Sequence, residues 1–439
     1  MKPHTNFIDD NKLGILKEIH NKRLKTYSIA ILSYSLLDYA LHKRRFLSMK
    51  FKNKFSYVVF IVFLIYIFSS STCYADSLLD SNDDIKSYIE THFKNRNNSI
   101  LDGDISFVKN NYDTSSNNGK YALDHEIRRI KYLRDWAGER GIKFTDIQSN
   151  CHFKNLNCNS DSCNFRVDEE WIFKYVYEDD INLTENLFGV NLFHMMNLKK
   201  SNNNYTISKE WYLDCFEDAL KSYDGCYEGT TLDNPKDKVF NFENIRNNDG
   251  INTNSSSKNY NKFKAVEYSD RYCGVPSLSN NPEKYNKKYI NFTGSGGNCT
   301  NFISQCLGDI EGGNLSQDYT WYTTNKTHTH KDYSPAWVNA DAFKNYLLYS
   351  GKGSLIKKGS FEECLKFNES TGKKFIDSLE LGDVIAYSKK NDIDHNAIVT
   401  GFDSKGYPLI NSHTVDRYHV PFDLGWGDKD IFFLLIHIK

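Results

Sequence analysis

The sequence lacks an excess of basic side chains. Its 55 Lys and Arg residues nearly balance its 56 Asp and Glu residues, which gives a formal net charge of −1. Residues 1–75 carry 12 of the basic and four of the acidic side chains, so the rest of the chain has 43 basic and 52 acidic side chains and a formal charge of −9. A body of this sign is a poor binder of nucleic acid, whose phosphates attract Lys and Arg. We therefore expect no nucleic-acid partner.

Two other features are missing. No segment repeats along the chain, which excludes tandem wall-binding modules built from repeats. No His-Glu-x-x-His sequence occurs, which excludes the usual helical zinc site of metallohydrolases. The chain has 439 residues, of which 39% are hydrophobic, so it has room for two ordinary domains with packed cores.

Residues 49–75 have the pattern of a signal peptide. A basic segment, Met49–Lys54, precedes an uncharged apolar run, Tyr57–Phe68, and small residues lead to a cleavage site after Ala75. The run is shorter than the roughly 20 residues that a membrane span needs. We expect a secreted or cell-surface protein, attached to a membrane only if this segment is retained. Residues 1–48 are either a cytoplasmic extension or precede the true translation start at Met49.

The remaining chain divides by composition into two predicted domains. Helical patterns at 84–94 and 123–141, followed by alternating strand patterns near 171–177, 190–195 and 205–207, predict a small α+β domain over residues 76–228. Asn, Ser, Thr, Asp and Lys dominate residues 229–258, which we interpret as a linker. Residues 259–439 show helical patterns first and strand patterns after 384. This order predicts a papain-like α+β domain with an antiparallel sheet.

Ten cysteines are present, nine of them after residue 75. Cys151, Cys158 and Cys163 form one group, and Cys215 and Cys226 lie close together in sequence. In an exported protein these are local disulfides or free thiols. The odd number leaves at least one thiol unpaired.

The strongest chemical signal is Gly-Ser-Gly-Gly-Asn-Cys, residues 294–299, directly before a helical pattern over residues 299–307. A cysteine at a helix start is next to unpaired backbone N–H groups, which lower the thiol pKa and can bind an oxyanion. The glycines permit a tight approach and leave room for substrate near Gly297 and Asn298. The alternative is a small buried side chain at a helix start.

A thiol nucleophile needs a base, and His395 is the candidate. It opens an aliphatic strand pattern over residues 395–400, although a lone histidine is more often an ordinary loop residue. Asn411 and His413 share one face of the next strand, because strand side chains alternate. Either one is a candidate to hold the second ring nitrogen of His395, and we prefer Asn411. Trp321 and Trp337 are candidates to flank a substrate groove, with core packing as the alternative.

The segment Gly296–Gln305 resembles the nucleophile segment of the putative amidase domain family, which is related to the papain-like NlpC/P60 and CHAP hydrolases. Further matches fall in the family's order, at 260–269, 321–322, 334–337, 382–385, 394–395 and 412–418. The resemblance covers about residues 259–439. The sequence departs from the family in having Asn298 where Asp is usual, and in the Gly-Ser that precedes the paired glycines.

The resemblance implies an exported cysteine amidohydrolase that cleaves an amide bond in peptidoglycan or a related peptide, without a cofactor or metal. One alternative is a non-catalytic surface module that keeps the fold to bind glycan or protein. The other is a zinc hydrolase using His413, Asp416 and His419, although Asp416 and His413 should face opposite ways on a strand.

Overall fold

The computed structural model describes residues 82–439 apart from 202–203, 243–259 and 427–429. Residues 82–439 form one compact unit. The expected extension at 1–48 and signal peptide or anchor at 49–75 lie outside the described residues. Within the described part of the chain, no helix is both long and apolar enough to cross a membrane.

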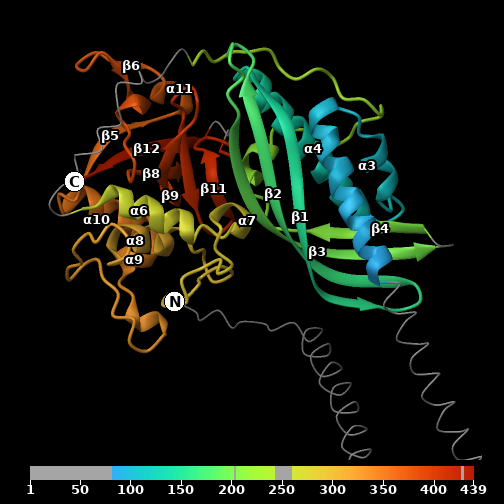
Figure 1. The fold of residues 1–439 in the computed structure, drawn as a ribbon, viewed down its shortest axis with the longest axis horizontal. Coiled ribbons are helices and arrows are strands. Elements are labelled where there is room, and N and C mark those ends of the chain that lie inside the picture. Colours follow the sequence, from blue (N-terminus) through green and yellow to red (C-terminus); the bar gives the residue numbers. More distant parts are fainter. Residues whose placement is uncertain (1–81, 202–203, 243–259, 427–429) are drawn as a thin grey trace, which may run out of the picture. The chain divides into compact units, whose positions relative to one another are not determined.

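The first part of the described chain combines helices with four long strands. Residues 82–102 are helical, and the later elements are α3 (Ser106–Asn111), α4 (Asn117–Glu139), β1 (Ile142–Cys158), β2 (Ser162–Tyr177), β3 (Asn186–Ser201), β4 (Asn204–Trp211) and α5 (Glu217–Leu220). The helices lie against the strands (Figure 1). Ile127, Ile130 and Leu133 repeat at helical spacing on α4 and are buried, as the apolar pattern predicts.

The second part begins with helices and ends with strands. Its larger helices are α6 (Lys262–Arg271), α8 (Cys299–Gly308) and α10 (Ala340–Tyr349), and its shorter ones are α7 (Pro276–Ser279), α9 (Pro335–Val338) and α11 (Phe361–Cys364). Its main strands are β5 (Gly353–Gly359), β8 (Val384–Lys389), β9 (Asp392–Phe402), β10 (Pro408–Ser412), β11 (Asp416–Pro421) and β12 (Ile431–Ile438). The α+β class is therefore confirmed; the papain-like assignment stays a prediction.

One antiparallel sheet of ten strands runs through both parts. Its order is β1-β2-β3-β11-β10-β9-β8-β12-β5, with β4 also paired to β3. The two parts meet where β3 pairs with β11, and there Asn191 lies opposite Asp416. The predicted division into residues 76–228 and 259–439 thus falls on either side of a continuous sheet.

Two hydrophobic cores cover the two faces of the second part of the sheet. One contains Tyr387, Ala397 and Val399 together with α4 and the strands of the first part, whereas the other contains Ala386 and Ile398 together with α6, α8 and α10. Leu232 and Phe242, from the segment predicted to be a linker, are buried in the former. The beginning of the predicted linker, residues 229–242, therefore packs against the core, and the linker prediction is wrong for these residues.

The core of the first part also holds a chain of buried charges. Arg96 pairs with Glu169, whose other oxygen lies 3.0 Å from His194 Nε2. His194 Nδ1 lies 2.7 Å from Glu210, which accepts a hydrogen bond from Tyr112. Burial opposes a charge on His194, but hydrogen bonds to both carboxylates raise its pKa. These charges are paired, as buried charges must be.

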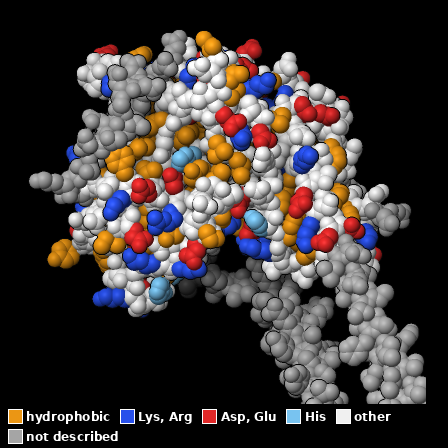
Figure 2. All heavy atoms as spheres, viewed as in Figure 1, with side chains coloured by type: hydrophobic (Ala, Val, Ile, Leu, Met, Phe, Trp, Pro, Cys, Tyr) orange, Lys and Arg blue, Asp and Glu red, His pale blue; other side chains and the backbone are white. Residues whose placement is uncertain are grey.

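A disulfide joins Cys158 to Cys163 across the β1–β2 turn, whereas Cys151, Cys215 and Cys226 are free. On the face seen in Figure 2, acidic and basic side chains are interspersed, without a large area of one sign. This surface agrees with the charge balance of the sequence.

Candidate active site

Cys299 is the first residue of α8, as the sequence predicts. It directly follows the glycine-rich turn, in which Gly294, Gly296 and Gly297 all have positive φ, from 85° to 105°. Side chains rarely adopt this backbone conformation, so the turn needs glycine. A Cβ on Gly297 would also lie 3.1 Å from Thr414 Oγ1. Cys299 is 8% exposed and lies beside the unpaired backbone N–H groups of the helix N-terminus.

Asn298 fixes the turn before the cysteine. Its backbone N–H donates to Thr414 Oγ1 over 2.9 Å, and its Oδ1 accepts hydrogen bonds from the Phe292 N–H and the Asn301 side chain. Its Nδ2 donates to His413 Nδ1 over 2.8 Å. An aspartate has no such N–H to donate, so the family's usual Asp would require a proton on His413 Nδ1. Asn298 is 2% exposed and acts here on the turn itself.

Thr300 and Asn396 link the nucleophile helix to strand β9. The Thr300 hydroxyl lies 3.7 Å from Cys299 Sγ and accepts a hydrogen bond from Asn396 Nδ2 over 3.0 Å. Because an amide N–H only donates, the hydroxyl proton of Thr300 is free to point at the sulfur. This contact gives the sulfur a hydroxyl donor. Sequence reasoning missed both residues; the available signal was Asn396, an amide within an aliphatic strand.

His395 sits one residue before Asn396, but its side chain takes the other face of the sheet. It lies opposite Tyr387 in the register, and its ring packs 5.7 Å from Tyr387 and 5.3 Å from Trp426. Its Nε2 is buried and has no hydrogen-bond partner among the described residues. Burial, then the charge of Arg417, lowers the pKa of His395 to about 3. The ring is therefore neutral at physiological pH.

Neither expected partner of His395 is hydrogen-bonded to it in the described structure. Asn411 donates to Asp270 over 2.8 Å and accepts from Thr400 and from the His419 backbone. His413 Nε2 lies 2.6 Å from the Tyr272 carbonyl and must carry the proton, so Nδ1 accepts from Asn298. The His413 ring also stacks on Phe302, with centroids 3.7 Å apart. His413 is thus beside the nucleophile segment, with both ring nitrogens occupied.

The two tryptophans correct an expectation. Trp321 and Trp337 are fully buried and stacked on each other at 4.9 Å, so neither indole lines a groove. Their N–H groups donate to Ser304 and Asn301 of α8. Burial of a large indole ring in the core is favourable when its N–H finds an acceptor. Here the two rings pack behind α8 and their hydrogen bonds fix the position of that helix.

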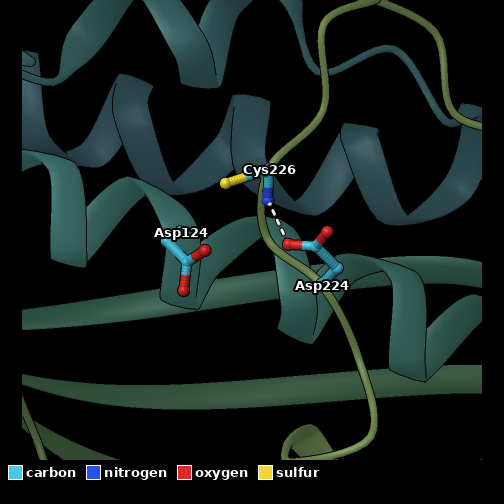
Figure 3. Close-up of side chains that lie close together, drawn as sticks. All are labelled: Asp124, Asp224 and Cys226. Carbon is cyan, nitrogen blue, oxygen red and sulfur yellow. Dashed lines mark hydrogen bonds between the residues drawn. The ribbon is translucent and has the colours of Figure 1, made fainter.

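The alternative zinc ligands do not converge. His413 bonds to Asn298 and Tyr272, Asp416 accepts from Tyr285, and His419 lies 2.9 Å from Asp270. The described residues contain one group with metal-ligand spacing, Asp124, Asp224 and Cys226, at the side of α4 (Figure 3). Asp124 already pairs with Arg128, and Asp224 accepts from the Cys226 N–H. We assign no function to that group.

The second part of the chain is similar in sequence to known proteins. Residues 259–436 match the family model described as "Putative amidase domain". The uncharacterized protein YjcM of Bacillus subtilis (strain 168) is 29% identical over 191 residues, 41% of this chain and 37% of that protein. The uncharacterized protein YhbB of the same organism is 29% identical over 163 residues, 36% of this chain and 42% of that protein. These matches span less than half of either relative, and no solved structure matches the chain. Over residues 259–436, this chain is therefore similar to the putative amidase domain family.

Proposed function

We propose that this chain is an exported cysteine amidohydrolase that cleaves an amide bond in peptidoglycan or a related peptide. The observation that carries the proposal is Cys299 at the N-terminus of α8, with the Thr300 hydroxyl 3.7 Å from its sulfur. The amidase family match supports hydrolysis. The Cys158–Cys163 disulfide supports export, because disulfides persist in oxidising compartments.

In this mechanism the Cys299 thiolate attacks the amide carbon, and N–H groups at the start of α8 stabilise the oxyanion. The histidine that took the thiol proton returns it to the leaving amine, and a thioester remains. Water, deprotonated by the same histidine, then attacks the thioester and releases the carboxylic acid and the thiol.

We assign the proton transfer to His395, because its Nε2 has no partner among the described residues, whereas both nitrogens of His413 are engaged. His395 shares its sheet face with Tyr387. Asn396, the next residue, contacts Thr300 of α8 on the opposite face, so side-chain rotation alone does not bring the imidazole to Sγ. The proposal therefore requires this end of β9 to rearrange when substrate binds, so that the imidazole comes within about 3 Å of Sγ. His413 keeps Asn298 and the glycine turn in place.

The test uses iodoacetamide labelling with mass mapping, beside peptidoglycan digestion. We expect fast labelling at Cys299 and loss of muropeptide release in Cys299→Ala. Cys226→Ala, which removes an exposed free thiol, is the control and should keep activity. Slow labelling at Cys299 would instead favour a non-catalytic binding module.

The two histidines are tested in the same assay. His395→Ala should lower turnover by about 10²–10⁴-fold, the usual contribution of a general base. If His413→Ala caused that loss and His395→Ala did not, the base would be His413.

A further inference from the structure

A large cavity of about 1260 Å³ lies away from Cys299, where the two parts of the chain meet. Three of its walls come from the first part: the helix at 82–102 and strands β1 and β2. The fourth comes from residues 276–284, which precede the glycine turn. The cavity exceeds the roughly 300–1,000 Å³ of ordinary small-molecule sites. It therefore has room for an extended ligand.

The walls are polar and carry both signs of charge. Carboxylates come from Glu90, Asp146, Asp168 and Glu170, and amines from Lys94, Lys154 and Lys284. Most other lining residues are amides, hydroxyls and a histidine. A cavity of this composition suits a ligand with many hydrogen-bonding groups and charges of both signs, not an apolar one.

The cavity is a built feature of the fold. Glu170 is 2% exposed, and its two oxygens lie 3.1 Å from His152 Nε2 and 2.8 Å from the Ser277 backbone N–H. The second contact ties the 276–284 wall to β2. Asp168, 1% exposed, is held by Lys154 and Arg166 at 2.5 and 2.7 Å. The opposing walls are therefore fixed to each other before any ligand binds.

Lys284 is a cavity-lining amine near the carboxylates of Asp416, Asp168 and Glu170, which attract its charge without hydrogen-bonding to it. Its Nζ is buried and has no hydrogen-bond partner among the described residues, and it lies 5.2 Å from the Phe193 ring centre. An ammonium out of water without an acceptor costs free energy. A carboxylate or carbonyl of a ligand would satisfy it.

The cavity wall formed by residues 276–284 is connected to the nucleophile segment through side-chain contacts. Tyr285 follows Lys284, and its ring lies 4.9 Å from that of His413. His413 in turn accepts from Asn298, the neighbour of Cys299. A ligand held against residues 276–284 is thus linked to the reacting end through three side chains.

We propose that this cavity binds the non-reacting end of the substrate, a short peptide with free carboxylate and ammonium groups, and that Lys284 receives the carboxylate. This inference rests on the proposed function and assigns residues 82–228 a role in substrate recognition. Glu90, on the helix at 82–102, and Asp146, on β1, receive the ammonium group.

The test is calorimetric titration of the full chain carrying Cys299→Ala, which stops turnover. The probe is a disaccharide–tetrapeptide muropeptide, beside the same disaccharide without peptide. Adding Lys284→Met should weaken muropeptide binding about tenfold or more, the usual effect of a hydrogen bond to a charged group. Glu90→Gln, at an exposed site, should weaken it severalfold. Lys358→Met, at an exposed lysine on β5 outside the cavity, is the matched control and should bind normally.

The outcomes separate this inference from the proposed function. Equal binding by the Lys284→Met and Lys358→Met chains, or equal binding of the peptide-free disaccharide, would overturn the cavity assignment. Absence of muropeptide binding would overturn it too. In each case the proposed function is judged separately, by iodoacetamide labelling and muropeptide release with Cys299 intact. In that active chain, Lys284→Met should raise KM and leave the labelling rate of Cys299 unchanged.

Discussion

Asp416 makes the stability of this protein depend on pH, and Asp416→Asn should remove that dependence. The carboxyl is 1% exposed at the β3–β11 junction, and burial raises its pKa to about 7 in spite of a 2.6 Å hydrogen bond from Tyr285. An unfolded aspartate has a pKa of about 3.9. The folded state therefore holds a proton that the unfolded state has lost between pH 4 and pH 7.

The difference between the folded and unfolded pKa values of Asp416 fixes how the free energy of unfolding changes with pH. Stability is full below about pH 4, falls as pH rises to about 7 and is constant above that value, with a total loss of about 4 kcal/mol for a shift of three units. Asparagine imitates the protonated acid. Its N–H₂ can also donate to Asn191 Oδ1, which has no hydrogen-bond partner in the described structure. Asp416→Asn should exceed the free energy of unfolding of the natural chain by about 1 kcal/mol at pH 4.5 and by about 4 kcal/mol at pH 8.

The assay is urea unfolding from pH 4.5 to 8.5, read as the difference between the two chains. Asp383 and Asp403, whose pKa values are also raised by burial, contribute equally to both and cancel. Asp416→Ala is the control and should be less stable, because Tyr285 and Asn191 lose their partner. Parallel pH profiles, or an Asn variant that is less stable at pH 8, would refute the reasoning.

Three other predictions concern the site and the cores. Thr300→Val should slow alkylation of Cys299 by iodoacetamide severalfold, because it removes the hydroxyl 3.7 Å from the sulfur, whereas Thr300→Ser should not; equal alkylation rates for the Val variant and the natural chain would exclude this contact. Trp337→Ala should cost about 3–5 kcal/mol in urea unfolding, since it empties a fully buried site behind α8; a loss below 1 kcal/mol would mean that α8 does not depend on it. Glu169→Gln should cost about 3–5 kcal/mol, because the buried Arg96 charge loses its counterion, and an unchanged unfolding midpoint would contradict that pairing.

Local chemistry was readable from the sequence. The glycine turn predicted the helix start at Cys299, and aliphatic alternation predicted β9 and β10. Strand β1 was missed because its outer half is polar and alternates only weakly, so its strand form depends on pairing with β2. Such pairing between distant segments has no signature in either segment alone.

The face taken by His395 could not be predicted for a similar reason. Period-two alternation puts Asn411 and His413 on the side of α6 and α8, where they lie. Between Ile393 and His395, however, the pairing of β8 with β9 shifts register, and the shift decides which face His395 takes. The bonds of Asn411 and His413 to Asp270, Tyr272 and Asn298 likewise depend on tertiary packing.

The pairing of β3 with β11 has a consequence for any fragment of this protein. The family match begins at residue 259, but a fragment starting there would leave β11 as an open sheet edge. Unpaired backbone N–H and C=O groups along an edge recruit other strands and promote aggregation. It would also uncover Tyr387, Val399 and Phe433, which pack in the core shared with α4. The family match starts at residue 259, but stable folding of that region therefore also requires the strands and helices of residues 82–228.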